Sequence, residues 1–496
     1  MTFRIKQWIK MLLQNVVLPL IYSLYRTKPV EKGLVIFADA HHTKMPFSMR
    51  KMAGTMRDLQ EHYQENPDGQ AAGETGCGPE KLQSVSNVAD DTARLASVKA
   101  SIIDGDAIHP VGAKTDAEGG DAAINGPLRI ETFITDFDSL SFGAMAKYLL
   151  RFMRRYAVAE YVFICDYFLP VSSCRKRPET KVIQLWHSCG LTKKIAYDTE
   201  EDIPKGYHGN MFDNYTYLTM SAEVCVPVHE WALRLSREHI FATGISRTDY
   251  YFDEAWNARC RAQFQTEHPE AAGKKVALWA PTFRGNAAMP VLEGLDVIQK
   301  IANESKDEWY FVIKAHPHID RHGQVSNSSI PTEELFPVAD VLITDYSSVL
   351  FDYLLYRRPV ILYAPDLTEY EQARGFYIDY RSIPFPLAQT EEELRETLQD
   401  EIFSLSRPAE PSVQPTKFSK QTVVSIEQPT EFSEQPDVSI ERPTEFSEQT
   451  AGSWYLVHAD EIDEFRETYV GACDGHATER ILKLAGLAEP DADVEK

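Results

Sequence analysis

The sequence predicts two consecutive α/β domains, each built on a parallel, doubly wound sheet. Its 496 residues exceed what a single core organises, so the length favours several domains. Short apolar runs alternate with helical stretches, as in parallel sheets, and this alternation restarts near residue 275. We therefore expect an N-terminal domain over residues 31–255 and a C-terminal domain over residues 256–496. Two such halves face one another across a cleft, beyond the carboxyl ends of their strands.

The first thirty residues predict an amphipathic helix rather than a globular opening. Its cations include Arg4, Lys6 and Lys10, and the uncharged run over residues 11–25 is shorter than the roughly 20 apolar residues that a spanning helix needs. No small-residue cleavage site follows. We expect this helix, residues 1–30, to lie in the headgroup layer of an anionic membrane, the alternative being a helix packed on the protein's own core. Its apolar residues at helical spacing are Ile5, Trp8, Ile9, Leu12, Leu13, Val16, Leu20 and Leu24.

The strands of the N-terminal domain are predicted from apolar runs. These runs occupy residues 33–37, 129–135, 161–165, 182–186, 217–220 and 240–244, and a helix is expected over residues 144–157. The stretch over about residues 60–127 is rich in Gly, Ala, Asp and Ser. Because it cannot bury enough apolar surface to offset its ordering entropy, we interpret it as a mobile insertion.

The C-terminal domain is predicted from strand-like runs at residues 275–281, 310–317, 341–348 and 360–365. A unit of fourteen residues, PTKFSKQTVVSIEQ, repeats from residue 415 and is truncated in its third copy. This period is too short for a solenoid, so we predict a flexible tandem insertion over about residues 408–450, with a recognition tract as the alternative. A closing helix is expected over residues 465–486.

Composition excludes two classes of site. The formal net charge of −23 argues against a general nucleic-acid binder, which needs a basic face. The seven cysteines form no CxxC pair, which suits a reducing cytosol and makes a structural zinc site improbable. His318 and His322 invite a metal interpretation, but no acidic or cysteine complement accompanies them. We predict no metal and no cofactor.

Polar residues at the end of strand 182–186 suggest proton transfer. His187 leaves this buried strand into a loop, where an imidazole with a near-neutral pKa is well placed as a general base. Lys193 and Lys194 follow and are candidates for phosphate contact. Taken alone, such a histidine is more often a structural residue.

Two further strand ends predict anion binding. Lys314 and His316 end strand 310–315 and are suited to holding a diphosphate. Ser347 and Ser348 open a helix whose free N–H groups and dipole attract anions, although a plain N-cap is the alternative.

The remaining candidates support the same site. Asp345 and Asp352 are predicted to orient partners or to bind a ribose or polyol hydroxyl. Thr282 and Arg284 follow strand 275–281, and Arg374 lies beyond a strand–helix unit. An arginine can grip phosphate with two hydrogen bonds. No single cluster is decisive, and their shared position at strand ends carries the prediction.

These segments resemble a known family. QLWHSCGLTKK, TGISRTDYYFD, WAPTFR, KAHP, ITDYSSVLFDYLLYRRPVILYAPDLTEYEQARGFYIDY and DGHATERI are similar, in order, to motifs of the CDP-glycerol glycerophosphotransferases, the teichoic-acid primases and polymerases. The resemblance covers roughly residues 160–385 and 465–485, with the strand near 33–37. It implies a GT-B fold, with the active site between two Rossmann-like domains.

The resemblance also implies roles. His187 matches a candidate base for the acceptor hydroxyl, and His316 matches a histidine near the donor diphosphate. By the same match Ser347 and Ser348 begin the phosphate-binding helix, and Thr282, Arg284 and Arg374 lie on the donor side. From their positions we also predict Lys314, Asp345 and Asp352 on the donor side, and Lys193, Lys194 and Arg247 on the acceptor side.

The chain departs from the family pattern mainly on the acceptor side. It has WHSCGLTK where many members have WHGTPLK, and Gly244-Ile245-Ser246-Arg247 where they have G-x-P-R. These changes affect the acceptor more than the donor class. Neither the acidic insertion nor the tandem repeat belongs to the pattern.

The function expected from this resemblance is transfer of glycerol-phosphate, or a related polyol-phosphate, from CDP-glycerol or a similar CDP-polyol to a lipid-linked polymer, with release of CMP. Such proteins work peripherally on the cytoplasmic face of the cell membrane. The alternatives are a GT-B sugar transferase of capsule synthesis and a non-catalytic membrane scaffold. The sequence leaves open glycerol versus ribitol, primase versus polymerase, the acceptor and any homo-oligomer.

Overall fold

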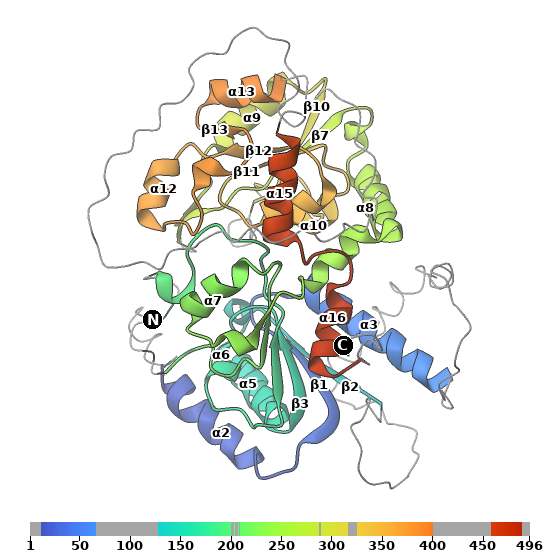
Figure 1. Cartoon of the computed structure of the whole chain (residues 1–496), viewed down its shortest axis with the longest axis vertical. Coiled ribbons are helices and arrows are strands. Elements are labelled where there is room, and N and C mark those ends of the chain that lie inside the picture. The colour runs from blue at the N-terminus through green and yellow to red at the C-terminus, as the bar shows by residue number, and fades with distance from the viewer. Residues whose placement is uncertain are drawn as a thin grey trace.

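The protein folds into two α/β domains, stacked along the long axis of the molecule in Figure 1. The computed structural model describes residues 11–65, 127–199, 203, 207, 209–286, 289–315, 325–399 and 458–488. Most of the predicted insertion and the whole tandem repeat lie outside these residues, as do His316, His318 and His322. The predictions made for those segments are therefore untested.

The N-terminal domain contains a six-stranded sheet in the order β2-β1-β3-β4-β5-β6, and all its strands pair in parallel. Its strands are β1 (Glu31–Asp39), β2 (Arg129–Ile134), β3 (Ala159–Ile164), β4 (Lys181–Gln184), β5 (Tyr217–Thr219) and β6 (Ile240–Phe241). Its helices include α2 (Leu18–Tyr25), α3 (Phe47–Glu65), α5 (Phe142–Tyr156), α6 (Leu169–Ser172) and α7 (Cys225–Leu233).

Alternation along β1 explains why the sheet is covered on both faces. Leu34 and Ile36 belong to one buried cluster, whereas Val35 and Phe37 belong to another on the opposite face. Successive side chains of a strand point to opposite faces, so a run that is apolar throughout indicates a strand buried on both sides.

The C-terminal domain contains a five-stranded parallel sheet in the order β10-β7-β11-β12-β13. Its strands are β7 (Lys275–Trp279), β10 (Trp309–Ile313), β11 (Val341–Thr344), β12 (Val360–Tyr363) and β13 (Leu387–Ala388), and a short hairpin joins β8 (Arg284–Asn286) to β9 (Met289–Val291). Its helices include α8 (Glu254–Glu267), α9 (Leu295–Glu304), α10 (Thr332–Leu335), α11 (Val349–Tyr353), α12 (Leu367–Ala373) and α13 (Glu391–Gln399). β8, β9 and β13 were not predicted, because their runs of two or three residues are too short to show a period.

The strand orders place a topological switch point in each sheet. In the N-terminal domain the order reverses between β1 and β3, and in the C-terminal domain it reverses between β7 and β11. Ligands of open α/β sheets bind beyond the carboxyl ends of the strands at such points. The residues that follow β1, β3, β7 and β11 are therefore the first places to look for a site.

The single closing helix predicted over residues 465–486 is wrong, because two helices occupy this segment. α15 (Ala459–Val470) packs beside α11 through Phe465, and α16 (Ala477–Ala485) packs into the core of the N-terminal domain (Figure 1). Asp249 explains the break, since its carboxylate accepts the backbone N–H groups of Ala477 and Thr478 at the start of α16. α16, which was predicted as part of the C-terminal domain, therefore belongs to the core of the N-terminal domain.

The described part of the opening helix packs on the protein's own core. Leu18 and Tyr22 are buried, and the Tyr22 ring lies 5.1 Å from that of Tyr156 on α5. The residues on this side of the helix therefore fit the alternative prediction, a helix packed on the protein's own core. No helix in the described ranges is both long enough and apolar enough to cross a bilayer.

Candidate active site

His187 stands in a strained turn directly after β4. The preceding residue, Trp186, has φ of 53°, a left-handed conformation that is costly for a bulky side chain, and its N–H donates to the side-chain oxygen of Gln184 at 3.1 Å. The indole is nearly buried and stacks at a tilt on the imidazole of His187, with centroids 5.0 Å apart. Strain maintained by packing often marks a functional position. The turn presents a half-exposed imidazole at the carboxyl edge of the sheet.

Asp166 and His229 surround this turn. Nδ1 of His187 lies 3.7 Å from Oδ1 of Asp166, close enough for charge attraction but not for a hydrogen bond. His229 is buried edge-on against Trp186, and burial lowers its pKa to about 4. The imidazole of His229 is therefore neutral where it packs against the indole of Trp186.

The loop after β4 joins the two domains through backbone hydrogen bonds. Lys194 N–H donates to the carbonyl of Gly375, and Tyr377 N–H donates to the carbonyl of Thr192. Arg374 adds a side-chain bond from Nε to the carbonyl of Lys194, at 3.1 Å. These bonds bring the predicted acceptor-side lysines together with Arg374.

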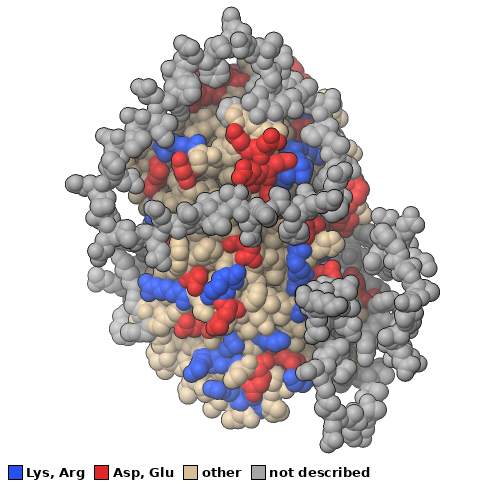
Figure 2. Space-filling view, viewed as in Figure 1, with Lys and Arg blue, Asp and Glu red and all other residues tan. Residues whose placement is uncertain are grey.

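The resulting set of Lys193, Lys194 and Arg374, called the junction cations below, lies where the carboxyl-end loops of both sheets meet. Each of the three is half-buried. Three neighbouring cations at such a position suit a phosphate-bearing ligand. On the face shown in Figure 2, basic and acidic residues are interspersed.

Arg247 and Asp352 pair with each other across the domains. Nε and Nη2 of the arginine donate to the two carboxylate oxygens at 2.8 and 2.7 Å, and both residues are buried. Tyr251 O–H also donates to Asp352, and Nη2 lies 3.5 Å from the sulfur of Cys189. Arg247 was predicted on the acceptor side and Asp352 on the donor side. The structure shows that they form an interdomain tie.

Arg284 is occupied by protein oxygens. Its Nε and Nη2 contact both oxygens of Asp366 at 2.6 and 2.8 Å, Nη2 also lies 2.9 Å from Asp345, and Nη1 donates to the carbonyl of Thr282. The rings of Tyr346 and Tyr370 lie within 4.9 Å of the guanidinium carbon.

These contacts assign Arg284 a positioning role. Burial by itself would lower the pKa of the Arg284 guanidinium, but hydrogen bonds to Asp366 and the charge of Asp345 outweigh it and raise the pKa. The guanidinium thus joins the ends of β7 and β11 to the start of α12. It holds the loops of the C-terminal switch point in place, whereas it was predicted to contact phosphate.

Asp345 and Thr282 line the same switch point. The buried carboxylate of Asp345 accepts the backbone N–H of Thr282 at 2.7 Å. The Asp345 carboxylate is thus occupied by this bond and by Arg284, whereas the Thr282 hydroxyl is buried and has no hydrogen-bond partner among the described residues.

Ser347 and Ser348 begin α11 as predicted, and both are half-buried. Ser348 is the N-cap residue but makes no side-chain capping bond, and the Ser347 oxygen is 3.5 Å from the N–H of Val349. The plain capping interpretation is therefore weakly supported, and the hydroxyls remain candidates for an anion. One turn later, the ring of Phe351 packs against Gly190 of the loop after β4.

Lys314 lies at the end of β10, at the edge of the C-terminal sheet. Its ammonium group donates to the carbonyl of Ser328 at 3.0 Å. Its predicted partner, His316, lies outside the described residues. Within the described ranges no three His, Cys, Asp or Glu residues are placed to hold a metal ion.

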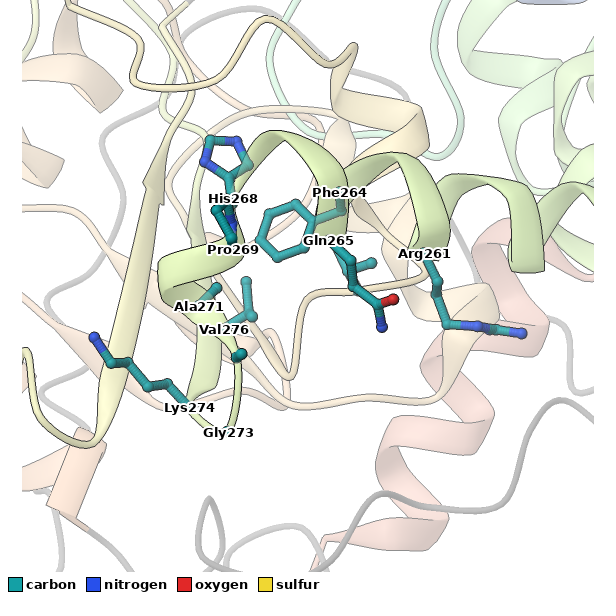
Figure 3. Close-up of a pocket in the computed structure, with 11 residues that line it drawn as sticks. Arg261, Phe264, Gln265, His268, Pro269, Ala271, Gly273, Lys274 and Val276 are labelled. Carbon is teal, nitrogen blue, oxygen red and sulfur yellow. The ribbon is translucent and has the colours of Figure 1, made fainter.

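A separate hollow lies away from these residues. It is lined by residues of α8, the following turn and the start of β7, including Phe264, His268 and Lys274 (Figure 3). Because it opens near the amino end of β7, it lies at the wrong edge of the sheet for a switch-point ligand. Its lining includes none of the predicted site residues.

Sequence reasoning missed several residues that the fold brings to these loops. Asp366 and Tyr370 contact Arg284, while Asp39 ends β1, His42 follows it, and Asp166 follows β3 at the N-terminal switch point. A signal was present, since Asp39 and His42 stand directly after the predicted strand 33–37 and Asp166 after strand 161–165.

Comparison with known proteins identifies the family. The family model described as CDP-Glycerol:Poly(glycerophosphate) glycerophosphotransferase matches residues 135–408. The teichoic acid poly(ribitol-phosphate) polymerase of Bacillus spizizenii is 32% identical over 274 residues, covering 52% of this chain and 44% of that protein. The teichoic acid ribitol-phosphate primase of the same species is 33% identical over 286 residues, covering 53% of this chain and 72% of the primase.

Relatives of the glycerol type and one solved structure complete the comparison. The teichoic acid glycerol-phosphate primase of Bacillus subtilis is 30% identical over 242 residues, 45% of this chain and 60% of that protein. The wall teichoic acid polymerase TagF has a similar fold, with a TM-score of 0.58 at 18% identity over 98% of both chains. This chain thus spans less than half of the polymerase and most of the ribitol-phosphate primase. Because the family model matches more than half of its residues, the chain belongs to the CDP-glycerol:poly(glycerophosphate) glycerophosphotransferase family.

Proposed function

We propose that this protein transfers a polyol-phosphate, either glycerol-phosphate or ribitol-phosphate, from its CDP-activated form to a teichoic-acid-type polymer. The observation that carries this proposal is the meeting of the carboxyl-end loops of both sheets, which brings a presented imidazole, His187, to the loop that bears the junction cations. Family membership supports the reaction class. The relatives named above include proteins for both polyols, so the polyol itself is decided by experiment.

In the proposed mechanism, an acceptor hydroxyl gives its proton to the imidazole of His187 while its oxygen attacks the phosphorus that bears the polyol. A new P–O bond forms to the acceptor, the P–O bond to CMP breaks, and CMP leaves with the electron pair. Phosphoryl transfer depends mainly on positioning and on stabilising charge, which the junction cations supply. Lys314, His316 and the helix start at Ser347 and Ser348 are proposed to hold the donor's phosphates.

Nucleotide release tests this function directly. Purified protein is incubated with membranes and with CDP-glycerol, CDP-ribitol or nucleotide-sugars, and the released nucleotide is identified. Release of CMP from one or both CDP-polyols is expected. Release of UMP or UDP instead would support a sugar transferase, and release of no nucleotide would support a scaffold.

We also propose that the protein works peripherally at an anionic membrane, on its cytoplasmic face. Leu12, Val16, Leu20 and Leu24 recur every fourth residue and are 52–67% exposed, opposite the buried face of the opening helix. On the adjoining helix α5, Phe142 is also exposed. Exposed cations lie on the same helix, at Lys147, Arg151 and Arg154. An apolar row beside cations suits the headgroup layer.

Vesicle sedimentation tests the membrane proposal. The double variant Leu20→Glu/Leu24→Glu should lose binding to vesicles with anionic lipid. Leu59→Glu is the matched control, because Leu59 on α3 is 45% exposed but lies outside the row. Equal binding by all three proteins would refute the proposal.

A further inference from the structure

The N-terminal switch point holds polar residues that no role above uses. β1 and β3 are neighbours at the reversal of strand order, and β4 pairs with β3. Asp39 ends β1 with His42 three residues later, Asp166 follows β3, and His187 follows β4. The register pairs Phe37 with Phe163 and Ile164 with Gln184, so these strands end at one edge.

Asp39 and His42 form a hydrogen-bonded pair. Nδ1 of His42 lies 2.9 Å from Oδ1 of Asp39, and the same oxygen accepts the backbone N–H groups of His41 and His42. The carboxylate is 1% exposed and the imidazole 50% exposed. Because Nδ1 carries the proton of this bond, the ring orientation is fixed and Nε2 points away from Asp39. Among the described residues, Nε2 makes no hydrogen bond.

The pair belongs to the same loop cluster as His187. Nε2 of His41 lies 3.2 Å from the carbonyl of Tyr167, which ties the loop after β1 to the loop after β3. Asp166, in that second loop, lies 3.7 Å from the ring of His187. The same Asp166 carboxylate acts electrostatically on His42. Asp166 therefore stands near both imidazoles.

The charges around His42 define what it can bind. The hydrogen bond to Asp39 raises the pKa of the His42 imidazole despite its partial burial, and the charges of Asp166 and of Glu333 on α10 act in the same direction. One carboxylate thus bonds to the imidazole, and two more act on it through space. This negative surrounding disfavours a phosphate, whereas Nε2 of His42 and the partly exposed carboxylate of Asp166 can bind neutral hydroxyl groups.

We propose that Asp39 and His42 hold the neutral polyol terminus of the acceptor, with His42 binding a hydroxyl next to the one that His187 activates. This inference rests on the function proposed above and names the part of the acceptor that the N-terminal domain recognises. His42 then contacts the substrate directly, and Asp39 acts through His42 as a positioning residue. The phosphates of the acceptor chain lie outside this cluster, toward the junction cations.

The test separates acceptor binding from chemistry. Three variants, His42→Gln, His42→Ala and Asp39→Asn, are compared with wild type using a poly(glycerol-phosphate) oligomer that ends in a free polyol, or a ribitol oligomer if CDP-ribitol is the donor. The KM for the oligomer should rise by about tenfold, the effect of losing one hydrogen bond to a substrate. The KM for the CDP-polyol should stay within twofold. His476→Gln, an exposed histidine at the start of α16, is the matched control and should change neither constant.

A binding measurement makes the inference independent of turnover. The ring proton signal of His42, assigned by its loss in His42→Gln, is followed by NMR while the oligomer is added without donor. It should shift with the free-ended oligomer and stay unchanged with an oligomer whose terminus carries a phosphate.

The outcomes separate this inference from the proposed function. An active wild type with an unchanged oligomer KM in both His42 variants, or equal shifts with both oligomers, would overturn the inference alone. A wild type that releases no CMP from any CDP-polyol would overturn the proposed function, and the NMR shifts would then decide whether His42 binds a polyol. Since His42 is half-exposed, His42→Gln should fold normally, so a loss of affinity in that variant cannot be assigned to unfolding.

Discussion

The buried pair of Arg247 and Asp352 offers a sharp test of how the two domains are held together. Replacing Asp352 by Asn removes the charge but keeps the shape of the side chain. It leaves the Arg247 guanidinium, 8% exposed, without its only carboxylate partner among the described residues. Breaking one partner of a buried ion pair typically costs about 3–5 kcal/mol. We therefore expect Asp352→Asn to lower the free energy of unfolding by that amount.

The assay is thermal unfolding of the purified chain, with the double variant Arg247→Met/Asp352→Leu as the key comparison. A loss of about 3–5 kcal/mol corresponds to a fall in Tm of roughly 6–20 °C for a domain of this size. Because an apolar pair of similar volume is often as stable as a buried ion pair, the double variant should regain most of this loss. The surface pair Arg381–Glu371 is the control, and Arg381→Met should change stability by about 1 kcal/mol or less.

Two results would refute this reasoning. A fall of less than about 1 kcal/mol in Asp352→Asn would mean that water or a rearranged side chain compensates the arginine. A double variant as unstable as the single one would mean that the loss comes from packing around Tyr251 and Cys189 rather than from the unpaired charge.

Three further predictions concern the turn after β4 and its surroundings. Burial lowers the pKa of His229 to about 4, so the unfolded chain takes up a proton before the folded one as pH falls. The free energy of unfolding should therefore decline by about 3 kcal/mol between about pH 6.5 and 4. In urea unfolding, His229→Phe should show a shallower decline than wild type over this range, and parallel curves would exclude His229 as the cause. Gly190→Ala places a Cβ about 2.3 Å from the Phe351 ring at a φ of +63°. This variant should lower the free energy of unfolding by about 1–3 kcal/mol and loosen the domain junction, as measured by thermal unfolding and by proteolysis after residue 190. Gly209→Ala is the control, because Gly209 also has a positive φ but open space around it. His187→Ala should lower kcat by about 100-fold or more without altering Tm, because the ring is half-exposed, and near-normal CMP release by this variant would contradict its role as the base.

Much of the architecture was predictable because its signals are local. Apolar runs such as residues 161–165 and 360–365 correspond to β3 and β12 within two residues, since a strand buried on both faces must be apolar throughout. The position of His187 at a strand end follows from the same runs. Parallel strands align their carboxyl ends, so residues far apart in the chain could be assigned to one edge without knowing the strand order.

The partners of the site residues could not be predicted in this way. Arg247 and Asp352 are 105 residues apart, and Arg284 and Asp366 are 82 apart, and nothing in their local sequence marks them as pairs. Arg247, Asp352 and Arg284 were therefore assigned to ligand sites and Asp366 was not predicted at all, because a charged residue near a predicted site has no visible partner in the chain. Burial and pairing are tertiary properties that only the packed domains reveal.

The sequence by itself determined the class of fold, the two parallel sheets and the family, because hydrophobic periodicity and motif spacing are written along the chain. Only the tertiary structure decided the strand order, and with it the switch point between β1 and β3 where Asp39 and His42 stand. It also decided that α16 returns to the N-terminal domain and that Leu18 and Tyr22 pack inward. The physical reason is that these outcomes depend on which buried surfaces fit together across long separations, and local periodicity carries no information about that fit.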